Sequence, residues 1–472
     1  MILKKNNKKI AKKKNLSEKK LVKKEKNTPA KNDGEENTIS TKGSVRTPAL
    51  LRGMKDLLPK EEFFWKTLHH TAENLAEAYG FGLINTPILE ETALFVRSLG
   101  RGTDVVDKEM YSFEDLDGGK ICLRPEATAS CARAFIVHGM QSLPQPVKFW
   151  YYGPMFRHDR PQAGRYRQFT QFGCESFGVH DPVVDAELIA VAYHFLEDLG
   201  LKVNVHLNSL GTPEDRQNYL IELTGYLRTK RSYLCEDCKK RLVKNPLRVL
   251  DCKNLECKEV LNEAPQIIEW LSESSKSYFM KVLEYLDEIN VPYVLQNTLV
   301  RGLDYYTDTV FEIYLEEDSE GAQSALCGGG RYNGLVEQLG GRPTPGAGFS
   351  IGLERVISVL RKQTDEGTCK IKEVFPSVFF AQLGEQARRR ALRLLEVLRK
   401  SGIVVAHSFG KSSLKGQMEM ADKLKVRYSL ILGQKEVQDG TAIIRDMESG
   451  IQEIVDQKKL KNALEKKLQP KV

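Results

Sequence analysis

Three arginines occur in or directly after apolar, strand-like sequence, which is an unusual place for a permanent cation. Arg301 lies in the segment Leu299–Glu312, "LVRGLDYYTDTVFE", Arg157 lies in "MFRHD", and Arg355 lies in "GLERV". A buried guanidinium needs an anionic partner, and its fork suits carboxylate and phosphate oxygens. The three side chains could therefore form separate ion pairs within the protein. Alternatively, they could converge on one polyanionic ligand.

The elements that must position these arginines can be inferred from periodicity and from turn residues. Helical spacing of apolar residues predicts a helix over 61–79 and another over 181–199. Strand-like runs bounded by Gly and Pro follow the first helix, and strand character returns over 291–314. Between these strand groups, residues 211–290 are helical, Lys/Glu-rich and cysteine-bearing. We interpret them as an inserted domain of a catalytic region that spans 49–372.

The last hundred residues have the pattern of a separate domain. After a polar linker, residues 373–472 alternate strand, helix and strand, and then continue as helix, strand, turn and strand. Such an α/β unit is large enough to fold on its own.

Six motifs, in chain order, resemble those of the histidyl-tRNA synthetase family, of the bacterial type and of class II. "FGLINTPILEE" resembles class II motif 1, and "LRPEATASCARAF" resembles the amino-acid-binding loop. "YYGPMFRHDRPQAGRYRQFTQFGCESFG" resembles motif 2, and "PGAGFSIGLERV" resembles motif 3. "LVRGLDYYTDTVFE" and "CGGGRYNGLVEQLGG" resemble the two histidine-specific signatures. A single glycine-rich motif would be weak support, but six in order are strong.

The resemblance implies a fold and a reaction. The expected fold is an α+β class II catalytic core, an antiparallel sheet of about six or seven strands flanked by helices. It carries the helical insertion, and the C-terminal α/β domain is expected to bind the anticodon. The implied reaction is ATP-dependent ligation of L-histidine to tRNA(His) through histidyl-adenylate, which releases AMP and pyrophosphate. Mg²⁺ on the ATP phosphates, a homodimer, a cytoplasmic location and no membrane association are also expected.

The resemblance also assigns roles to individual residues. Arg157 and Arg301 are expected to stabilise the α-phosphate during catalysis, because fixed cations oppose the charge that develops there. Histidine binding is expected to involve Glu126, Ala127, Thr128, Arg157, Gln171, Glu175, Arg301, Tyr305 and Tyr306. ATP binding is expected to involve Arg157, Asp159, Arg165, Phe169, Arg301 and Arg355. The tRNA acceptor end is expected to meet Arg160, Gln162 and Arg167.

Four of the nine cysteines are clustered in the predicted insertion. Cys235 and Cys238 form a Cys-x₂-Cys pair, and Cys252 and Cys257 follow at a wider spacing. The pattern is near that of a zinc ribbon, but the second pair is wider than usual. We therefore expect reduced cysteines without a metal, and structural zinc remains the alternative. Scattered cysteines in an odd number argue against a disulfide framework.

The positive net charge of +8 comes from the first 48 residues. Residues 1–48 contain 15 Lys and Arg against 5 Asp and Glu, so the rest of the chain has a net charge of −2. This basic extension is expected to be disordered.

Two other functional classes remain: a catalytically silent regulatory relative of the synthetase, and a basic-tailed RNA-binding or scaffold protein. The retained arginines and C-terminal domain disfavour the first, and the second leaves the body of the chain unexplained.

Overall fold

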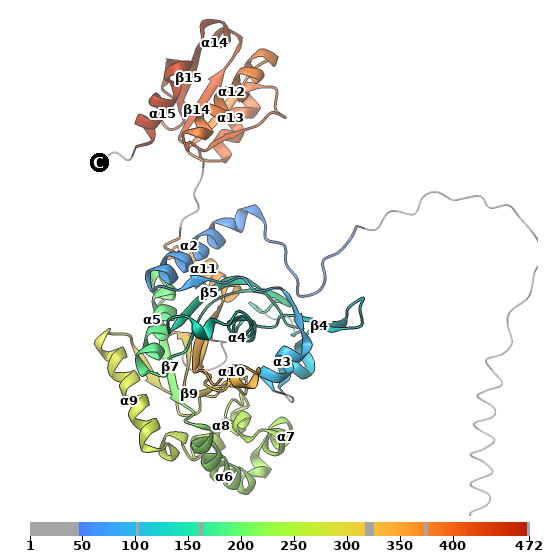
Figure 1. Cartoon of the computed structure of the whole chain (residues 1–472). Coiled ribbons are helices and arrows are strands. Elements are labelled where there is room, and N and C mark those ends of the chain that lie inside the picture. The colour runs from blue at the N-terminus through green and yellow to red at the C-terminus, as the bar shows by residue number, and fades with distance from the viewer. Residues whose placement is uncertain (1–46, 101–102, 160–163, 317–324, 372–375, 470–472) are drawn as a thin grey trace, which may run out of the picture. The chain divides into compact units, whose positions relative to one another are not determined.

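The computed structural model of the chain describes residues 47–100, 103–159, 164–316, 325–371 and 376–469. Most of the predicted basic extension therefore lies outside the described residues. The chain divides into two units, Met1–Leu50 and Leu51–Val472. All helices and strands that the structure describes belong to the second unit (Figure 1).

A large sheet organises the catalytic region. Its eight strands have the order β1-β5-β6-β11-β10-β9-β7-β8. The six central strands are antiparallel, whereas β1 pairs with β5 and β8 pairs with β7 in parallel. The strands are β1 (Gly82–Leu83), β5 (Val147–Phe156), β6 (Gln168–Phe177), β7 (Val203–Ser209), β8 (Tyr293–Leu295), β9 (Thr307–Leu315), β10 (Cys327–Arg331) and β11 (Gly346–Gly352). The sheet has eight strands where six or seven were expected, and its two edge strands contain only two and three residues.

Helices cover both faces of this sheet. On one face, four helices share an apolar core with the sheet. They are α2 (Glu62–Ala78), α5 (Pro182–Asp198), α9 (Glu273–Glu288) and α11 (Leu353–Asp365). The second core contains α3 (Thr92–Leu99), α4 (Thr128–Val137) and α10 (Leu335–Gln338). Next to α3 and α4 lies a three-stranded sheet of β2 (Leu89–Glu91), β4 (Lys120–Leu123) and β3 (Ser112–Glu114).

The inserted segment is helical, and Figure 1 shows its first three helices as a group of their own. These are α6 (Pro213–Thr229), α7 (Glu236–Lys244) and α8 (Leu255–Asn262). Asp215 connects the start of α6 with the start of α9. It completes the capping box with Thr212 at the start of α6, and its Oδ2 accepts a hydrogen bond of 2.6 Å from Ser275 Oγ in α9. Such caps satisfy backbone N–H groups that a helix start leaves unpaired.

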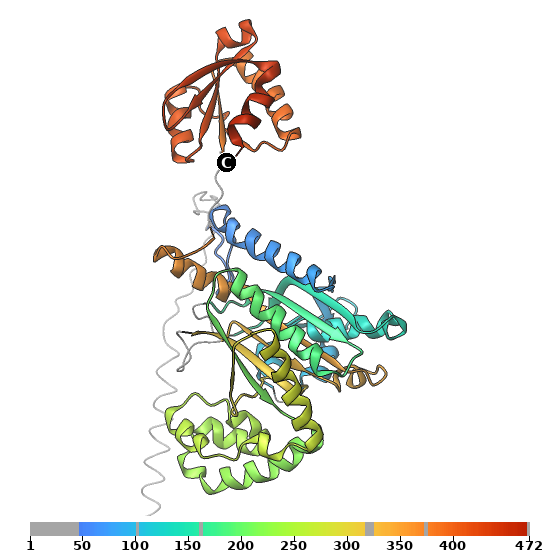
Figure 2. The same cartoon turned by 90° about the vertical axis from the view of Figure 1, so that its left-hand side faces the viewer.

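The C-terminal domain has its own sheet and core (Figure 2). The strand order is β13-β12-β14-β15-β16, with β12 parallel to both β13 and β14. The strands are β12 (Val378–Gln382), β13 (Val405–His407), β14 (Tyr428–Leu432), β15 (Thr441–Asp446) and β16 (Gln452–Asp456). The helices are α12 (Glu385–Lys400), α13 (Leu414–Lys423), α14 (Gln434–Asp439) and α15 (Leu460–Leu468). The prediction of an appended α/β fold is confirmed.

Among the described residues, no helix has the length and apolar character that a bilayer crossing requires.

Candidate active site

A cavity of about 1410 Å³ opens over one end of the large sheet. Its wall combines the ends of central strands, the loop before β9 and the 248–253 segment of the insertion. Eleven residues that the sequence predicted for the site line it together: Glu126, Thr128, Arg157, Asp159, Arg165, Phe169, Gln171, Arg301, Tyr305, Tyr306 and Arg355. Segments from across the chain thus meet at one site.

Two of the three arginines carry their charge into this cavity without a carboxylate partner. Arg157 follows β5, and its Nε donates to the carbonyl of Pro125 at 2.8 Å. Arg355 lies in the first turn of α11 and donates to the carbonyl of Ala325 at 2.6 Å. Within the described parts of the chain, neither of them makes an ion pair. Burial, together with the positive charges of Arg165 and Arg157, lowers the pKa of Arg355 to about 10. Cations that repel one another in a partly buried cavity favour the binding of an anion.

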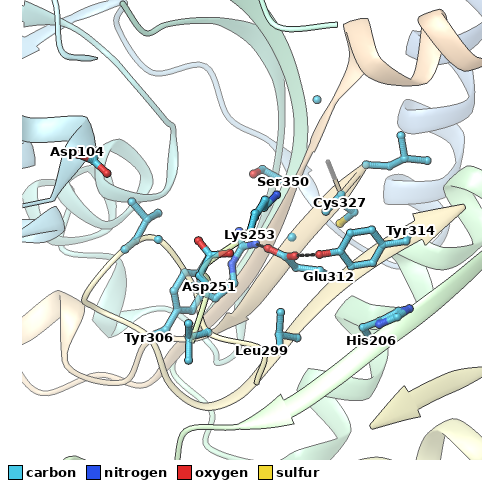
Figure 3. A pocket seen from close by; sticks show the side chains of 18 of the residues that line it. Asp104, His206, Asp251, Lys253, Leu299, Tyr306, Glu312, Tyr314, Cys327 and Ser350 are labelled. Atoms are coloured by element: carbon cyan, nitrogen blue, oxygen red, sulfur yellow. Dashed lines mark hydrogen bonds and ion pairs between the residues drawn. The ribbon is translucent and has the colours of Figure 1, made fainter. Parts of the chain in front are cut away.

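The third arginine, Arg301, does have a partner in the chain. Its guanidinium forms a very short ion pair with Glu312 of β9, and both side chains are less than one-fifth exposed. The Tyr314 hydroxyl donates to the same carboxylate (Figure 3). Burial opposes the charge on Arg301, but Glu312, Tyr306 and Tyr305 together outweigh this effect, so the pKa of Arg301 lies above its usual value. The Nε atom of Arg301 is buried and has no hydrogen-bond partner among the described residues.

Glycine at position 328 makes room for this guanidinium. A Cβ on Gly328 of β10 would overlap the terminal nitrogens of Arg301. The glycine-rich signature therefore has a steric reason here, since the backbone and the arginine lie closer than any side chain would allow.

Glu175 lies behind the cavity wall instead of lining the cavity. One carboxylate oxygen accepts from Thr128 Oγ1 at 2.6 Å and from the Tyr151 hydroxyl at 3.3 Å. The other oxygen accepts from the Tyr332 hydroxyl. The side chain is fully buried, and burial raises its pKa to about 8. Tyr332, in turn, is 5.6 Å from Tyr305 between ring centroids.

Sequence reasoning missed the tyrosines that hold Glu175. Tyr151 and Tyr332 were not assigned roles, although Tyr332 lies within the second signature, "CGGGRYNGLVEQLGG". The sequence alone left Asp304 and Glu312 as alternative ion-pair partners of Arg301, and the structure selects Glu312. A buried carboxylate needs hydrogen-bond donors, so the tyrosines of the matched motifs were the available signal.

The amino-acid-binding loop contributes the carboxylate of Glu126 to the cavity wall, and β6 contributes the amide of Gln171. Glu126 accepts hydrogen bonds from the backbone N–H of Thr128 at 2.7 Å and of Ala129 at 2.9 Å, which caps α4. Burial raises the pKa of Glu126. Ala127, also buried, occupies the position before α4 and does not line the cavity. Gln171 donates to Ser350 Oγ at 3.3 Å, while its own Oε1 is buried and unpartnered within the described residues. An unsatisfied acceptor at a cavity wall suits a ligand N–H group.

The motif 2 region supplies the remaining side chains. Asp159 and Arg165 form an ion pair of 3.1 Å. The guanidinium of Arg157 lies over the Phe169 ring, with its Cζ atom 5.5 Å from the ring centroid. The carbonyl of Arg167 accepts from the backbone N–H of Arg157 at 2.9 Å.

The three predicted tRNA contacts have different outcomes. Arg167 lies outside the cavity wall, and its Nε is a buried donor for which the described residues supply no acceptor. Arg160 and Gln162 lie outside the described residues.

The four cysteines of the insertion also meet in the structure. The sulfur atoms of Cys235, Cys238, Cys252 and Cys257 all lie within 4.8 Å of one another. This cluster is separate from the arginines, although Cys252 reaches the cavity wall.

Comparisons with known proteins identify the family of the chain. The family model described as histidyl-tRNA synthetase matches residues 53–214 and 237–356, and the model described as anticodon binding domain matches 377–467. A histidine–tRNA ligase of Desulforamulus reducens is 46% identical over 410 residues, covering 87% of this chain and 97% of the relative. One of Staphylococcus saprophyticus is 43% identical over 418 residues, covering 88% of this chain and 99% of the relative.

Solved structures give the same result. The apo histidyl-tRNA synthetase of S. aureus superposes with a TM-score of 0.73 at 36% identity, covering 88% of this chain and 99% of that one. A Bacillus halodurans protein described as an ATP phosphoribosyltransferase regulatory subunit/histidyl-tRNA synthetase has a TM-score of 0.60 at 20% identity. At that identity the likeness concerns the fold alone.

Proposed function

This chain belongs to the histidyl-tRNA synthetase family, and we propose that it ligates L-histidine to tRNA(His) with ATP. In the first step, a carboxylate oxygen of histidine forms a bond to the α-phosphorus, and the bond to the β-phosphate oxygen breaks. The products are histidyl-adenylate and pyrophosphate. In the second step, a ribose hydroxyl at the tRNA end takes the histidyl group, and AMP leaves. The observation that carries the proposal is the convergence of Arg157, Arg301 and Arg355 on one cavity in a chain of this family.

The arginines oppose the negative charge that develops on the α-phosphate. Arg157 would bridge the histidine carboxylate and the α-phosphate, and Arg301 would approach that phosphate from the β9 side. Preorganised cations in a partly dry cavity stabilise a transition state more than they do in water. Glu312 holds Arg301 in place before the substrate arrives.

Histidine would be recognised at both of its ends. The unpartnered Oε1 of Gln171 is suited to the α-ammonium group, together with Glu126 and Thr128 beside it. The imidazole would lie against Tyr305 and Tyr306, which line the cavity. Glu175 acts on this pocket through Thr128 and Tyr332, to which it is hydrogen-bonded. Paired polar groups of this kind reject isosteres that cannot satisfy them.

ATP would bind on the motif 2 side of the cavity. Phe169 supplies a ring face for the adenine, and Arg355 supplies a guanidinium that can stack on it. Asp159 and Arg165 are expected near the base and the phosphates. Two carboxylates here are already engaged: Asp159 pairs with Arg165, and Glu354 accepts from the backbone N–H of Thr170. This arrangement fits Mg²⁺ that arrives on the phosphates, where it would neutralise part of their charge.

Transfer to tRNA would use both domains. The C-terminal domain matches an anticodon-binding model and is proposed to bind the anticodon. Arg160, Gln162 and Arg167 are proposed to contact the acceptor end. We also propose a homodimer, since motif 1 resembles the interface segment of class II enzymes. The free cysteines among the described residues suit the reducing conditions of the cytoplasm, the proposed location.

ATP–pyrophosphate exchange, measured with each of the twenty amino acids in turn, tests the proposal. We expect exchange with histidine only, followed by charging of tRNA(His). Stimulation by another amino acid would refute the specificity. Absence of exchange with all twenty would refute the enzyme and favour the regulatory alternative.

A further inference from the structure

The four cysteines of the insertion come from two short helices and the turn between them. Cys235 is the residue before α7, and Cys238 lies in the first turn of that helix. Cys252 follows the short 3₁₀ turn of Pro246–Val249, and Cys257 lies in the first turn of α8. Residues up to 22 positions apart in the sequence thus present their sulfur atoms to a single point.

The distances suit a mononuclear tetrahedral site. With Zn–S bonds of about 2.3 Å, the edge of an S₄ tetrahedron is about 3.8 Å. The Sγ atoms of Cys235 and Cys252 are 3.8 Å apart, and all four sulfurs lie within 4.8 Å of one another. A disulfide requires about 2.05 Å between sulfurs, and all four cysteines are free thiols.

The surroundings of the four sulfur atoms supply helix N-termini, a backbone N–H donor and positive charge. Cys238 and Cys257 are fully buried, and each lies in the first turn of a helix, where the helix dipole stabilises negative charge. The backbone N–H of Cys235 donates to the sulfur of Cys257 at 3.2 Å. Residues 231–258 contain eight Lys and Arg against four Asp and Glu, which offsets the net −2 charge of a Zn²⁺ ion with four thiolates.

We propose that Cys235, Cys238, Cys252 and Cys257 bind one Zn²⁺ ion in a structural site. Four protein ligands fill the coordination sphere of tetrahedral zinc, so no position remains for water or substrate. The sequence favoured cysteines without a metal because the second pair is widely spaced. The tertiary structure reverses this preference, because the turn before Cys252 brings that sulfur beside Cys235.

The ion would fix the part of the insertion that contacts the active site. Asn245 Nδ2 donates to Asp304 Oδ1 at 3.1 Å, just after Arg301 in the chain. Asp251, labelled in Figure 3, and Cys252 both line the cavity. Zinc would therefore stabilise one wall of the cavity from outside it. This consequence rests on the proposed function, whereas zinc binding itself does not.

The primary test uses the full-length wild-type chain and needs no catalysis. Protein purified without chelators is analysed for metals. A metal-stripped sample is then titrated with Zn²⁺ and, separately, with Co²⁺. We expect about one zinc per chain, and a Co²⁺ complex with thiolate charge-transfer absorption and the visible bands of tetrahedral cobalt. Less than half an equivalent of zinc after re-addition would refute the site, and so would iron in its place or a Co²⁺ complex without thiolate bands.

A matched pair of variants locates the ion. Cys252→Ser removes one partly buried ligand, and Cys369→Ser removes one partly buried thiol outside the cluster. We expect the Zn²⁺ affinity of C252S to fall at least tenfold, while C369S binds zinc like wild type. Equal binding by both variants would refute the assignment. If C252S does not fold, the Co²⁺ spectrum of the wild-type chain still decides the question.

Activity provides a separate readout. We expect zinc removal to lower kcat/KM in ATP–pyrophosphate exchange and re-addition to restore it. A chain that binds zinc but shows no exchange with any amino acid would refute the proposed function and leave the metal site standing.

Discussion

Replacing Arg301 by lysine separates the charge of this side chain from its shape. The guanidinium pairs with Glu312 through Nη1, its Nε has no described partner, and its Cζ lies 5.5 Å from the Tyr306 ring centroid. Arginine can therefore hold Glu312 with one edge and offer the rest of its fork to a phosphate. Lysine has a single ammonium, which the carboxylate of Glu312 would occupy.

The expected effect follows from the loss of one charged donor at the reacting phosphate. Removing such a donor lowers kcat by about 10²–10³, or about 2.7–4 kcal/mol of transition-state stabilisation. The fold should change less, because Glu312 keeps a cationic partner and is not left as an unpaired buried charge. We expect the free energy of unfolding to decrease by about 1 kcal/mol, a typical value for a point substitution.

The assay is histidine-dependent ATP–pyrophosphate exchange, with urea unfolding of the same samples. Arg399→Lys is the matched control, since Arg399 is exposed in the C-terminal domain and pairs with Glu396. We expect R399K to exchange like wild type. Exchange by R301K within about threefold of wild type would show that the guanidinium does not meet the reacting phosphate, because that ratio is well below the expected effect.

Two further predictions concern Glu175 and the strand that covers it. Burial raises the pKa of Glu175 from about 4.5 in the unfolded chain to about 8 in the native state. Between these two pH values, the native state keeps a proton that the unfolded chain has lost. The free energy of unfolding therefore decreases as the pH rises through this window. Glu175→Gln removes this titration. In urea unfolding, the free energy of unfolding of the variant minus that of wild type should therefore increase by up to about 1.4 kcal/mol per pH unit across this window. A difference that does not change with pH would contradict the raised pKa. A Cβ on Gly348 would overlap the Glu175 carboxylate and lie 2.7 Å from the Cys174 carbonyl, whereas one on Gly334 meets nothing within 4 Å. Gly348→Ala should therefore lower the unfolding free energy by about 1–3 kcal/mol, and Gly334→Ala should leave it nearly unchanged; equal effects would refute the steric argument.

Much of the fold could be predicted because its long elements have clear periodicity and boundaries. The helix predicted over 181–199 corresponds to α5, Pro182–Asp198, whose first turn is capped by the Asp181 side chain. Strands β1 and β8 lie within stretches whose strand character was predicted, but their bounds were not, because elements of two or three residues form only when a neighbouring strand supplies their hydrogen bonds.

For the site, the sequence by itself determined which side chains carry permanent charge and which motifs hold them. Arg157, Arg301 and Arg355 could be named in this way, because residue type and local pattern are one-dimensional information. Only the tertiary structure decided that Arg301 pairs with Glu312, that Glu175 lies behind Thr128, and that four distant cysteines share one point. These outcomes depend on distances between side chains, which local sequence pattern does not fix and which the packing of the sheet and the insertion sets.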